Sequence, residues 1–126
     1  MTETEKNILI VEDNEFNSLY LSEVLSAYNV NLLNASNGHE AVKIVKKTPI
    51  DLIFMDVRMP EMDGREAAKK IRQDYPSIAI VAQTAYTSDN ESEQDEKIFD
   101  EYLLKPISKE KIRRVVEEYL HILPKK

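Results

Sequence analysis

The sequence predicts an α/β protein with a doubly wound sheet of five parallel strands. Short apolar runs alternate with amphipathic segments along the chain, and the runs stop abruptly at polar residues. Strands separated by helices imply right-handed crossovers and a mainly parallel sheet covered on both faces. With 126 residues, the chain has room for one domain, which we place at residues 7–123 behind an N-terminal tail at 1–6.

Five apolar runs are the predicted strands. They are residues 7–11, 30–35, 52–55, 78–82 and 102–104. The first and third runs resemble each other. Each has the composition of a buried strand, and they end at the acids Glu12-Asp13 and Asp56, respectively. The fourth ends at Gln83-Thr84 and the fifth at Lys105.

Helical spacing of apolar residues and capping residues predict the helices. The first helix is expected from Phe16, ends before Asn29, and has these apolar residues on one stripe: Phe16, Leu19, Tyr20, Val24 and Tyr28. Asn29 tolerates the left-handed conformation that ends many helices. Asn37, Asp63 and Ser108 are predicted N-caps of three later helices.

Composition excludes several classes of function. The net charge is -6, from 23 acidic and 17 basic residues, so general attraction to nucleic acid is not expected and the partner should be a protein. Cysteine is absent, which excludes disulfides and thiolate zinc sites. The start is polar, and no run approaches the roughly 20 apolar residues that span a bilayer, so we expect a cytoplasmic protein without a membrane partner.

The polar residues at the strand ends predict one site. Ligands of doubly wound sheets lie outside the carboxyl ends of the strands, and if the first and third strands are neighbours, Glu12, Asp13 and Asp56 share a crevice. Their mutual repulsion calls for a cation, and oxygen ligands alone favour Mg²⁺, Mn²⁺ or Ca²⁺. Asp56 could then accept a phosphoryl group, with the Lys105 cation and the Thr84 hydroxyl on its oxygens.

Four stretches resemble the receiver domain of two-component response regulators. They are VEDN at 11–14, MDVRMPEMDG at 55–64, QTA at 83–85 and YLLKPI at 102–107. They extend from the first strand to the fifth, and the first two look most like receivers of hybrid sensor kinases. The resemblance implies a flavodoxin-like sheet with strand order 2-1-3-4-5.

The resemblance also implies roles for individual residues. Asp56 looks like the phosphoacceptor, assisted by Thr84 and Lys105. Mg²⁺ or Mn²⁺ would be held by Glu12, Asp13, Asp56 and the backbone carbonyl of Arg58. Thr84 and Tyr102 match the switch positions, and the family places a cis peptide before the proline that matches Pro106.

The family's partners and one departure from its pattern complete the expectation. A histidine kinase or a histidine phosphotransfer protein would be the donor, the output partner is not identified, and a homodimer is compatible with the family. Where a receiver has a helix with an apolar inner stripe, residues 87–97 are eleven consecutive polar residues, so we predict a short, frayed or absent helix over 88–97.

Two other classes of function compete with the phospho-accepting switch. One is a pseudo-receiver, an interaction module without phosphorylation, which the complete set of carboxylates, threonine and lysine disfavours. The other is an enzyme with a separate substrate: a metal-dependent phosphatase would need a second acid two residues after Asp56, and a flavin protein would need a phosphate loop in place of the acids after the first strand. We therefore expect a phosphoacceptor that assists its own phosphorylation and dephosphorylation, and not a conventional enzyme.

Overall fold

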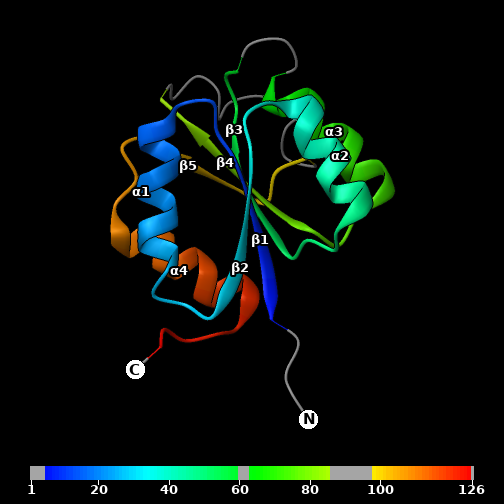
Figure 1. The fold of residues 1–126 in the computed structure, drawn as a ribbon. Coiled ribbons are helices and arrows are strands. Elements are labelled where there is room, and N and C mark those ends of the chain that lie inside the picture. Colours follow the sequence, from blue (N-terminus) through cyan, green and yellow to red (C-terminus); the bar gives the residue numbers. More distant parts are fainter. Residues whose placement is uncertain (1–4, 60–62, 86–97, 126) are drawn as a thin grey trace.

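The computed structural model describes residues 5–59, 63–85 and 98–125, and these form one parallel sheet between two layers of helices (Figure 1). The strands are β1 (Lys6–Val11), β2 (Val30–Ala35), β3 (Leu52–Asp56), β4 (Ala79–Thr84) and β5 (Glu101–Leu104). The helices are α1 (Glu15–Leu25), α2 (Gly38–Lys47), α3 (Gly64–Asp74) and α4 (Lys109–Leu120). The strand order β2-β1-β3-β4-β5 confirms the predicted doubly wound fold.

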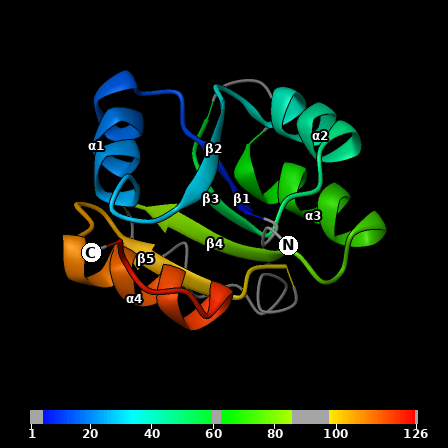
Figure 2. The same ribbon diagram turned by 60° about the horizontal axis from the view of Figure 1, so that its bottom comes forward.

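The two faces of the sheet carry separate apolar cores. Helices α2 and α3 cover one face, and α1 and α4 cover the other, as both ribbon views show (Figures 1 and 2). Alternate residues of β1 point to opposite faces, so Leu9 packs under α2 and α3 while Ile8 and Ile10 pack under α1 and α4. Residues 8–11 of β1 and 52–55 of β3 are buried on both faces of the sheet, and each of these stretches is a continuous apolar run.

The fourth strand lies further along the chain than predicted. We expected residues 78–82, whereas β4 runs to Thr84. Gln83 pairs with Asp56 of β3, and Thr84 pairs with Leu104 of β5, so the backbone ladder continues through two polar residues. Ladder hydrogen bonds use the main chain, so a polar side chain does not end a strand that has neighbours on both sides.

The predicted apolar stripe of α1 is partly wrong. Phe16, Leu19 and Tyr20 are 83%, 65% and 41% exposed. Val24 of the predicted stripe is buried as expected, and Leu21 and Leu25, which were not predicted, complete the buried side of the helix. Both sets have three-to-four spacing, and the apolar side chains of β1 and α4 decide which set is buried.

The end of α1 also differs from the prediction. The helix stops at Leu25, so Tyr28 lies beyond it, where the ring is buried and the hydroxyl donates to a Glu117 carboxylate oxygen at 2.6 Å. Asn29 does not adopt the left-handed conformation, which among described non-glycine residues occurs only at His121, the C-cap of α4. The last turn of α1 therefore ends without the expected asparagine cap.

The three predicted N-caps are confirmed. Side chains of Asn37, Asp63 and Ser108 accept hydrogen bonds from the backbone N–H three residues later, at 2.8, 3.0 and 3.2 Å. The helix predicted to be short over 88–97 lies outside the described residues. In the parts of the chain that the structure describes, none of the helices has the length and apolar character needed to cross a membrane.

Candidate functional site

The strand-end residues singled out from the sequence line one crevice at the carboxyl edge of the sheet. This edge lies at the switch point of the strand order, where β1 and β3 are neighbours and their connections leave in opposite directions. The crevice has a volume of about 260 Å³. It is lined by Glu12, Asp13, Asn14, Asn17, Asp56, Arg58, Thr84, Ala85 and Lys105.

Three carboxylates converge in this crevice. Glu12 and Asp56 are buried, at 5% and 4% exposure, while Asp13 is exposed. One oxygen from each of the three lies within 4.8 Å of the others. Carboxylate oxygens at this spacing suit a hard divalent cation such as Mg²⁺, which takes one or two carboxylates and completes its shell with water or phosphate oxygens.

Lys105 supplies the positive charge that the acids face. Its Nζ lies 3.0 Å from Glu12 Oε1 and 3.4 Å from Asp56 Oδ2, so one ammonium group is shared between two buried acids. Burial alone would lower the pKa of Lys105, but attraction to Asp56 and hydrogen bonding to Glu12 outweigh burial, and the pKa is raised. Lys105 therefore stays protonated. The peptide bond that follows, to Pro106, is cis, as the resemblance implied.

The Asp56 carboxyl group experiences the opposite balance. Burial, a hydrogen bond with Glu12 and repulsion from Glu12 raise its pKa from 3.8 to about 7, although Lys105 and the Arg58 backbone N–H act to lower it. The Arg58 N–H donates to Asp56 Oδ1 at 3.2 Å. One lysine thus does not compensate the acids. The donor set fits an additional cation, which would lower the pKa of Asp56 and favour its carboxylate form.

The remaining predicted residues lie in or near the crevice. Thr84 is buried at the end of β4, and its carbonyl accepts the Lys105 N–H at 2.8 Å. Arg58 has an exposed side chain, and the proposed use of its carbonyl remains a prediction. Tyr102 is half-buried, away from the crevice lining, and its ring packs edge-on against Phe99 with centroids 5.3 Å apart.

Two asparagines complete the lining and were not singled out from the sequence. Asn14 is the N-cap of α1, and its own N–H donates to Glu12 Oε2 at 3.2 Å, which helps to orient that carboxylate. Asn17 lies in the first turn of α1. Because Asn14 directly follows the two acids, its place in the crevice could have been predicted from the sequence. Asn17 has no such neighbour that would have indicated its place there.

Gly64 packs against the backbone at the carboxyl end of β3. It is the first residue of α3 and does not have a positive φ. A Cβ at this position would lie 2.1 Å from the Asp56 carbonyl oxygen, and the Gly64 N–H donates to the Val57 carbonyl at 2.8 Å. The start of α3 therefore packs directly on the backbone of Asp56, and glycine is needed for this close approach.

Comparison with known proteins gives consistent matches across the chain. The family model described as the response regulator receiver domain matches residues 8–117. The chain is 35% identical over 114 residues to the autoinducer 1 sensor kinase/phosphatase LuxN of Vibrio campbellii; the match covers 90% of this chain and 13% of LuxN. The chain therefore spans only a small part of that relative's length.

Two solved structures are close in fold and sequence. One is the receiver domain of Ssk1 from Saccharomyces cerevisiae in complex with the histidine phosphotransfer protein Ypd1, at 32% identity and a TM-score of 0.83, covering 94% of this chain and 91% of that one. The other is the receiver domain of the sensor histidine kinase PA1611 from Pseudomonas aeruginosa, with a magnesium ion in its active-site cleft. It has 27% identity and a TM-score of 0.83, covering 94% of this chain and 100% of that one.

Proposed function

This chain belongs to the response regulator receiver domain family, and from that membership we propose that it is a phosphorelay switch that accepts a phosphoryl group on Asp56. The observation that carries the proposal is the uneven charge of the crevice. The buried acids Glu12 and Asp56 share Lys105, and Asp13 adds a third carboxylate within 4.8 Å, which leaves the site short of positive charge unless a cation joins it. We retain residues 7–123 as the bounds of the domain and the cytoplasm as its location.

The proposed transfer uses Asp56 as the nucleophile. A carboxylate oxygen of Asp56 forms a bond to the phosphorus of a phosphohistidine, and the bond from phosphorus to the imidazole nitrogen breaks, so the electron pair stays on the donor histidine. Lys105, already 3.4 Å from Asp56, is placed to pair with a phosphoryl oxygen. The Thr84 hydroxyl is proposed to donate to a second oxygen.

Glu12, Asp13, Asp56 and the Arg58 carbonyl are the proposed ligands of Mg²⁺. The bound ion would neutralise the acids and the incoming phosphoryl group. The magnesium ion in the PA1611 receiver supports this assignment, since that domain shares the fold and 27% of its residues. The three acids would hold the metal ion, and Lys105 would reduce the net negative charge of the site.

We propose that phosphorylation shifts an existing equilibrium between two conformations. Thr84 and Tyr102 are the proposed reporters, because Thr84 lies in the crevice and Tyr102 pairs in register with Ala82, two residues before it on β4. A phosphoryl oxygen that attracts the Thr84 hydroxyl would favour one arrangement of this edge of the sheet over the other.

A histidine kinase or histidine phosphotransfer protein is the proposed donor. The Ssk1 receiver, at 32% identity, is bound to such a protein in its crystal structure. In this chain the first turn of α1 follows directly after the crevice acids and carries Phe16 at 83% exposure. A protein that reaches Asp56 would cover this apolar surface, as contacts between proteins commonly do.

The test is phosphorylation of the purified chain by acetyl phosphate with and without Mg²⁺, followed by mass spectrometry. We expect one added phosphoryl group that requires Mg²⁺ and is lost in Asp56→Asn. Lys105→Ala should lower the rate strongly without changing the modified residue. An unmodified wild-type chain that still binds partner proteins would instead support the pseudo-receiver alternative, and modification that persists in Asp56→Asn would disprove the assignment of the acceptor.

A further inference from the structure

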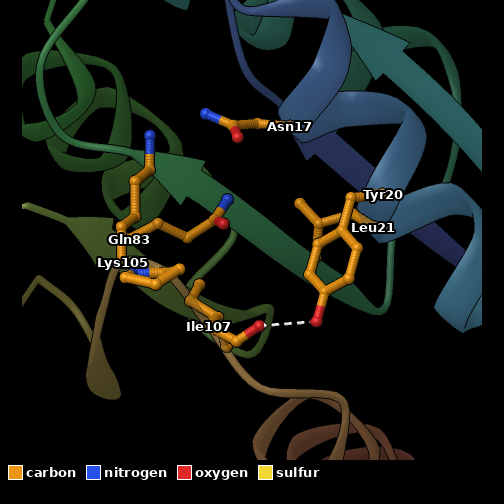
Figure 3. A pocket seen from close by; sticks show the side chains of 7 residues that line it. Asn17, Tyr20, Leu21, Gln83, Lys105 and Ile107 are labelled. Atoms are coloured by element: carbon orange, nitrogen blue, oxygen red, sulfur yellow. Dashed lines mark hydrogen bonds between the residues drawn. The ribbon is translucent and has the colours of Figure 1, made fainter.

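A second pocket lies beside the crevice, between α1 and the segment that joins β5 to α4 (Figure 3). Its volume is about 60 Å³. Leu21, Pro106 and Ile107 provide apolar walls, and on one side the Tyr20 hydroxyl donates to the Ile107 carbonyl at 2.8 Å. The hydrogen bond joins α1 to the β5–α4 segment, so the wall has a defined position.

The pocket contains a buried polar group that lacks a hydrogen bond. Gln83 is 2% exposed, and among the described residues its Nε2 has no partner. Figure 3 shows the carboxamide pointing into the space between Asn17, Tyr20 and Ile107. Two residues earlier on the same face of β4, Val81 packs in the apolar core under α1 and α4. A buried N–H donor costs free energy unless an acceptor pairs with it, so the Gln83 Nε2 is available to a hydrogen-bonding group that enters this pocket.

The lining defines the chemistry of that group. A carboxamide offers N–H donors and one carbonyl acceptor, so an amide or alcohol satisfies it in either orientation of the amide. Apolar walls disfavour a desolvated charge, and Lys105 is already paired with Glu12 and Asp56. The volume is less than half of the roughly 150 Å³ cavity that holds benzene, so only a short group fits.

The position of the pocket indicates where the group comes from. Asn17 and Lys105 line both the pocket and the phosphoacceptor crevice, so a protein bound over Asp56 also covers the pocket. A free molecule of about four non-hydrogen atoms binds weakly, because even the best small ligands gain limited free energy per atom. A side chain of an already docked protein binds with little further loss of translational entropy, because docking has already restricted its position.

We propose that this pocket, here called the Gln83 socket, receives a short neutral polar side chain of the phosphodonor protein, of the carboxamide or alcohol type, which hydrogen-bonds to Gln83. The inference rests on the proposed function, since it assumes a protein donor for Asp56. Gln83 then contributes to the choice of donor and takes no part in the bond-forming step.

The first test measures the chemistry of the socket without a partner protein. The isotope-labelled 126-residue chain is titrated with acetamide, and with acetate as a charged probe of the same size, while amide resonances are recorded by NMR. We expect the Gln83 side-chain amide and the amides of Tyr20, Leu21 and Ile107 to shift with acetamide concentration, as a weak free ligand does. Acetate should give smaller shifts at the same concentration, and the response should be lost in Gln83→Leu. No shift of these resonances at high acetamide concentration, an equal response to acetate or an unchanged response in Gln83→Leu would overturn the socket.

The second test separates the socket from the proposed function. Phosphorylation of wild type, Gln83→Leu and the matched control Gln73→Leu on the exposed face of α3 is compared with two donors: acetyl phosphate, and a histidine phosphotransfer protein that phosphorylates the wild type. For Gln83→Leu we expect kcat/KM with the protein donor to fall about tenfold, because one buried hydrogen bond is lost. The change should appear mainly in KM. The rate with acetyl phosphate should stay near that of the control.

The remaining outcomes have separate meanings. An equal loss with both donors would make Gln83 a structural support of the crevice and overturn the proposal, as would no loss with the protein donor. Failure of the wild type to accept a phosphoryl group from either donor would disprove the proposed function, while the acetamide titration would still report on the socket.

Discussion

Two clusters of charged residues at different edges of the sheet show contrasting chemistry. Near the start of β4, Arg72 of α3 makes five hydrogen bonds, to the carbonyls of Pro76, Ile78 and Ile98 and to the Asp100 carboxylate. A guanidinium group has five N–H donors, so this number matches its full capacity. Asp100 Oδ2 in turn accepts the Ile80 N–H at 2.7 Å.

The crevice at the carboxyl edge has the opposite balance. Glu12, Asp13 and Asp56 face one lysine, and the pKa of Asp56 is raised to about 7 by burial and by Glu12. A cluster whose polar atoms are all paired contributes to stability, whereas a cluster with surplus charge can bind an ion and a charged substrate. The structural cluster around Arg72 and the functional cluster in the crevice thus differ in how fully their charges are neutralised by partners.

The largest expected effect is at the compensated cluster. Arg72→Ala removes the guanidinium donor from three carbonyls and from Asp100, which keeps its bond from the Ile80 N–H, and the free energy of unfolding should fall by about 3 kcal/mol. Urea denaturation measures the loss, and Lys70→Ala, on the exposed side of the same helix, should change it by less than about 0.5 kcal/mol. Similar values for the two variants would show that the Arg72 contacts do not stabilise the fold.

Addition of Mg²⁺ should give the next largest effect, at the crevice alone. A ligand that binds only the folded state at 100 times its Kd stabilises that state by about 2.7 kcal/mol. The unfolding midpoint of the wild type should therefore rise with Mg²⁺ concentration, and the rise should be absent in Asp13→Asn. A rise of equal size in Asp13→Asn would place the bound ion elsewhere.

The metal-free crevice should make stability depend on pH. Because the pKa of Asp56 is about 7 in the folded state and 3.8 as its ordinary value, the folded chain binds more protons than the unfolded chain between these values. Its contribution to stability is therefore greatest at low pH and is lost as the pH rises towards 7. Urea titrations in EDTA should show this decline for the wild type relative to Asp56→Asn.

The same substitution predicts a modest gain at neutral pH. Without Mg²⁺, Asp56→Asn removes a buried charge that Lys105 does not fully compensate, and should stabilise the fold at pH 7.5 by about 1 kcal/mol. Parallel pH profiles for the two proteins, or a less stable variant, would contradict the assignment of surplus negative charge to this residue.

The smallest effect is expected at a third cluster, on the solvent side of β5 and α4. Arg114 pairs with Glu101 and Glu118, but its side chain is 44% exposed. Arg114→Ala should therefore change the free energy of unfolding by about 0.5 kcal/mol or less. A loss as large as that of Arg72→Ala would show that pairing alone, without burial, stabilises this protein.

The sequence was sufficient to predict the fold class and to bring Glu12, Asp13, Asp56, Thr84 and Lys105 to one crevice. Runs that stop at acids, a threonine and a lysine mark the carboxyl ends of strands, and parallel order brings those ends to one edge. The three N-caps were predictable because each relation spans only three residues along the chain. These are features that depend on local order and on one topological rule.

Features that depend on contacts between distant elements were not predictable. Whether α1 buries Leu19 or Leu21 depends on β1 and α4, and both choices satisfy helical spacing. Gln83 ends an apolar run and was taken as a mark of the strand end, whereas its side chain lies between two layers beside the β5–α4 segment. Helical periodicity and polarity describe one element at a time, so they do not identify the elements that pack against it.

The contact between Gly64 and Asp56 limits how a signal can leave the acceptor. The start of α3 packs on the carbonyl of Asp56, so a shift of that peptide group towards α3 would require the helix to move with it. The backbone of the acceptor is therefore expected to stay in place after modification. Conformational changes are expected instead in side chains and at the opposite edge of the sheet. The structural change that follows phosphorylation would therefore spread across the sheet, in the direction away from α3.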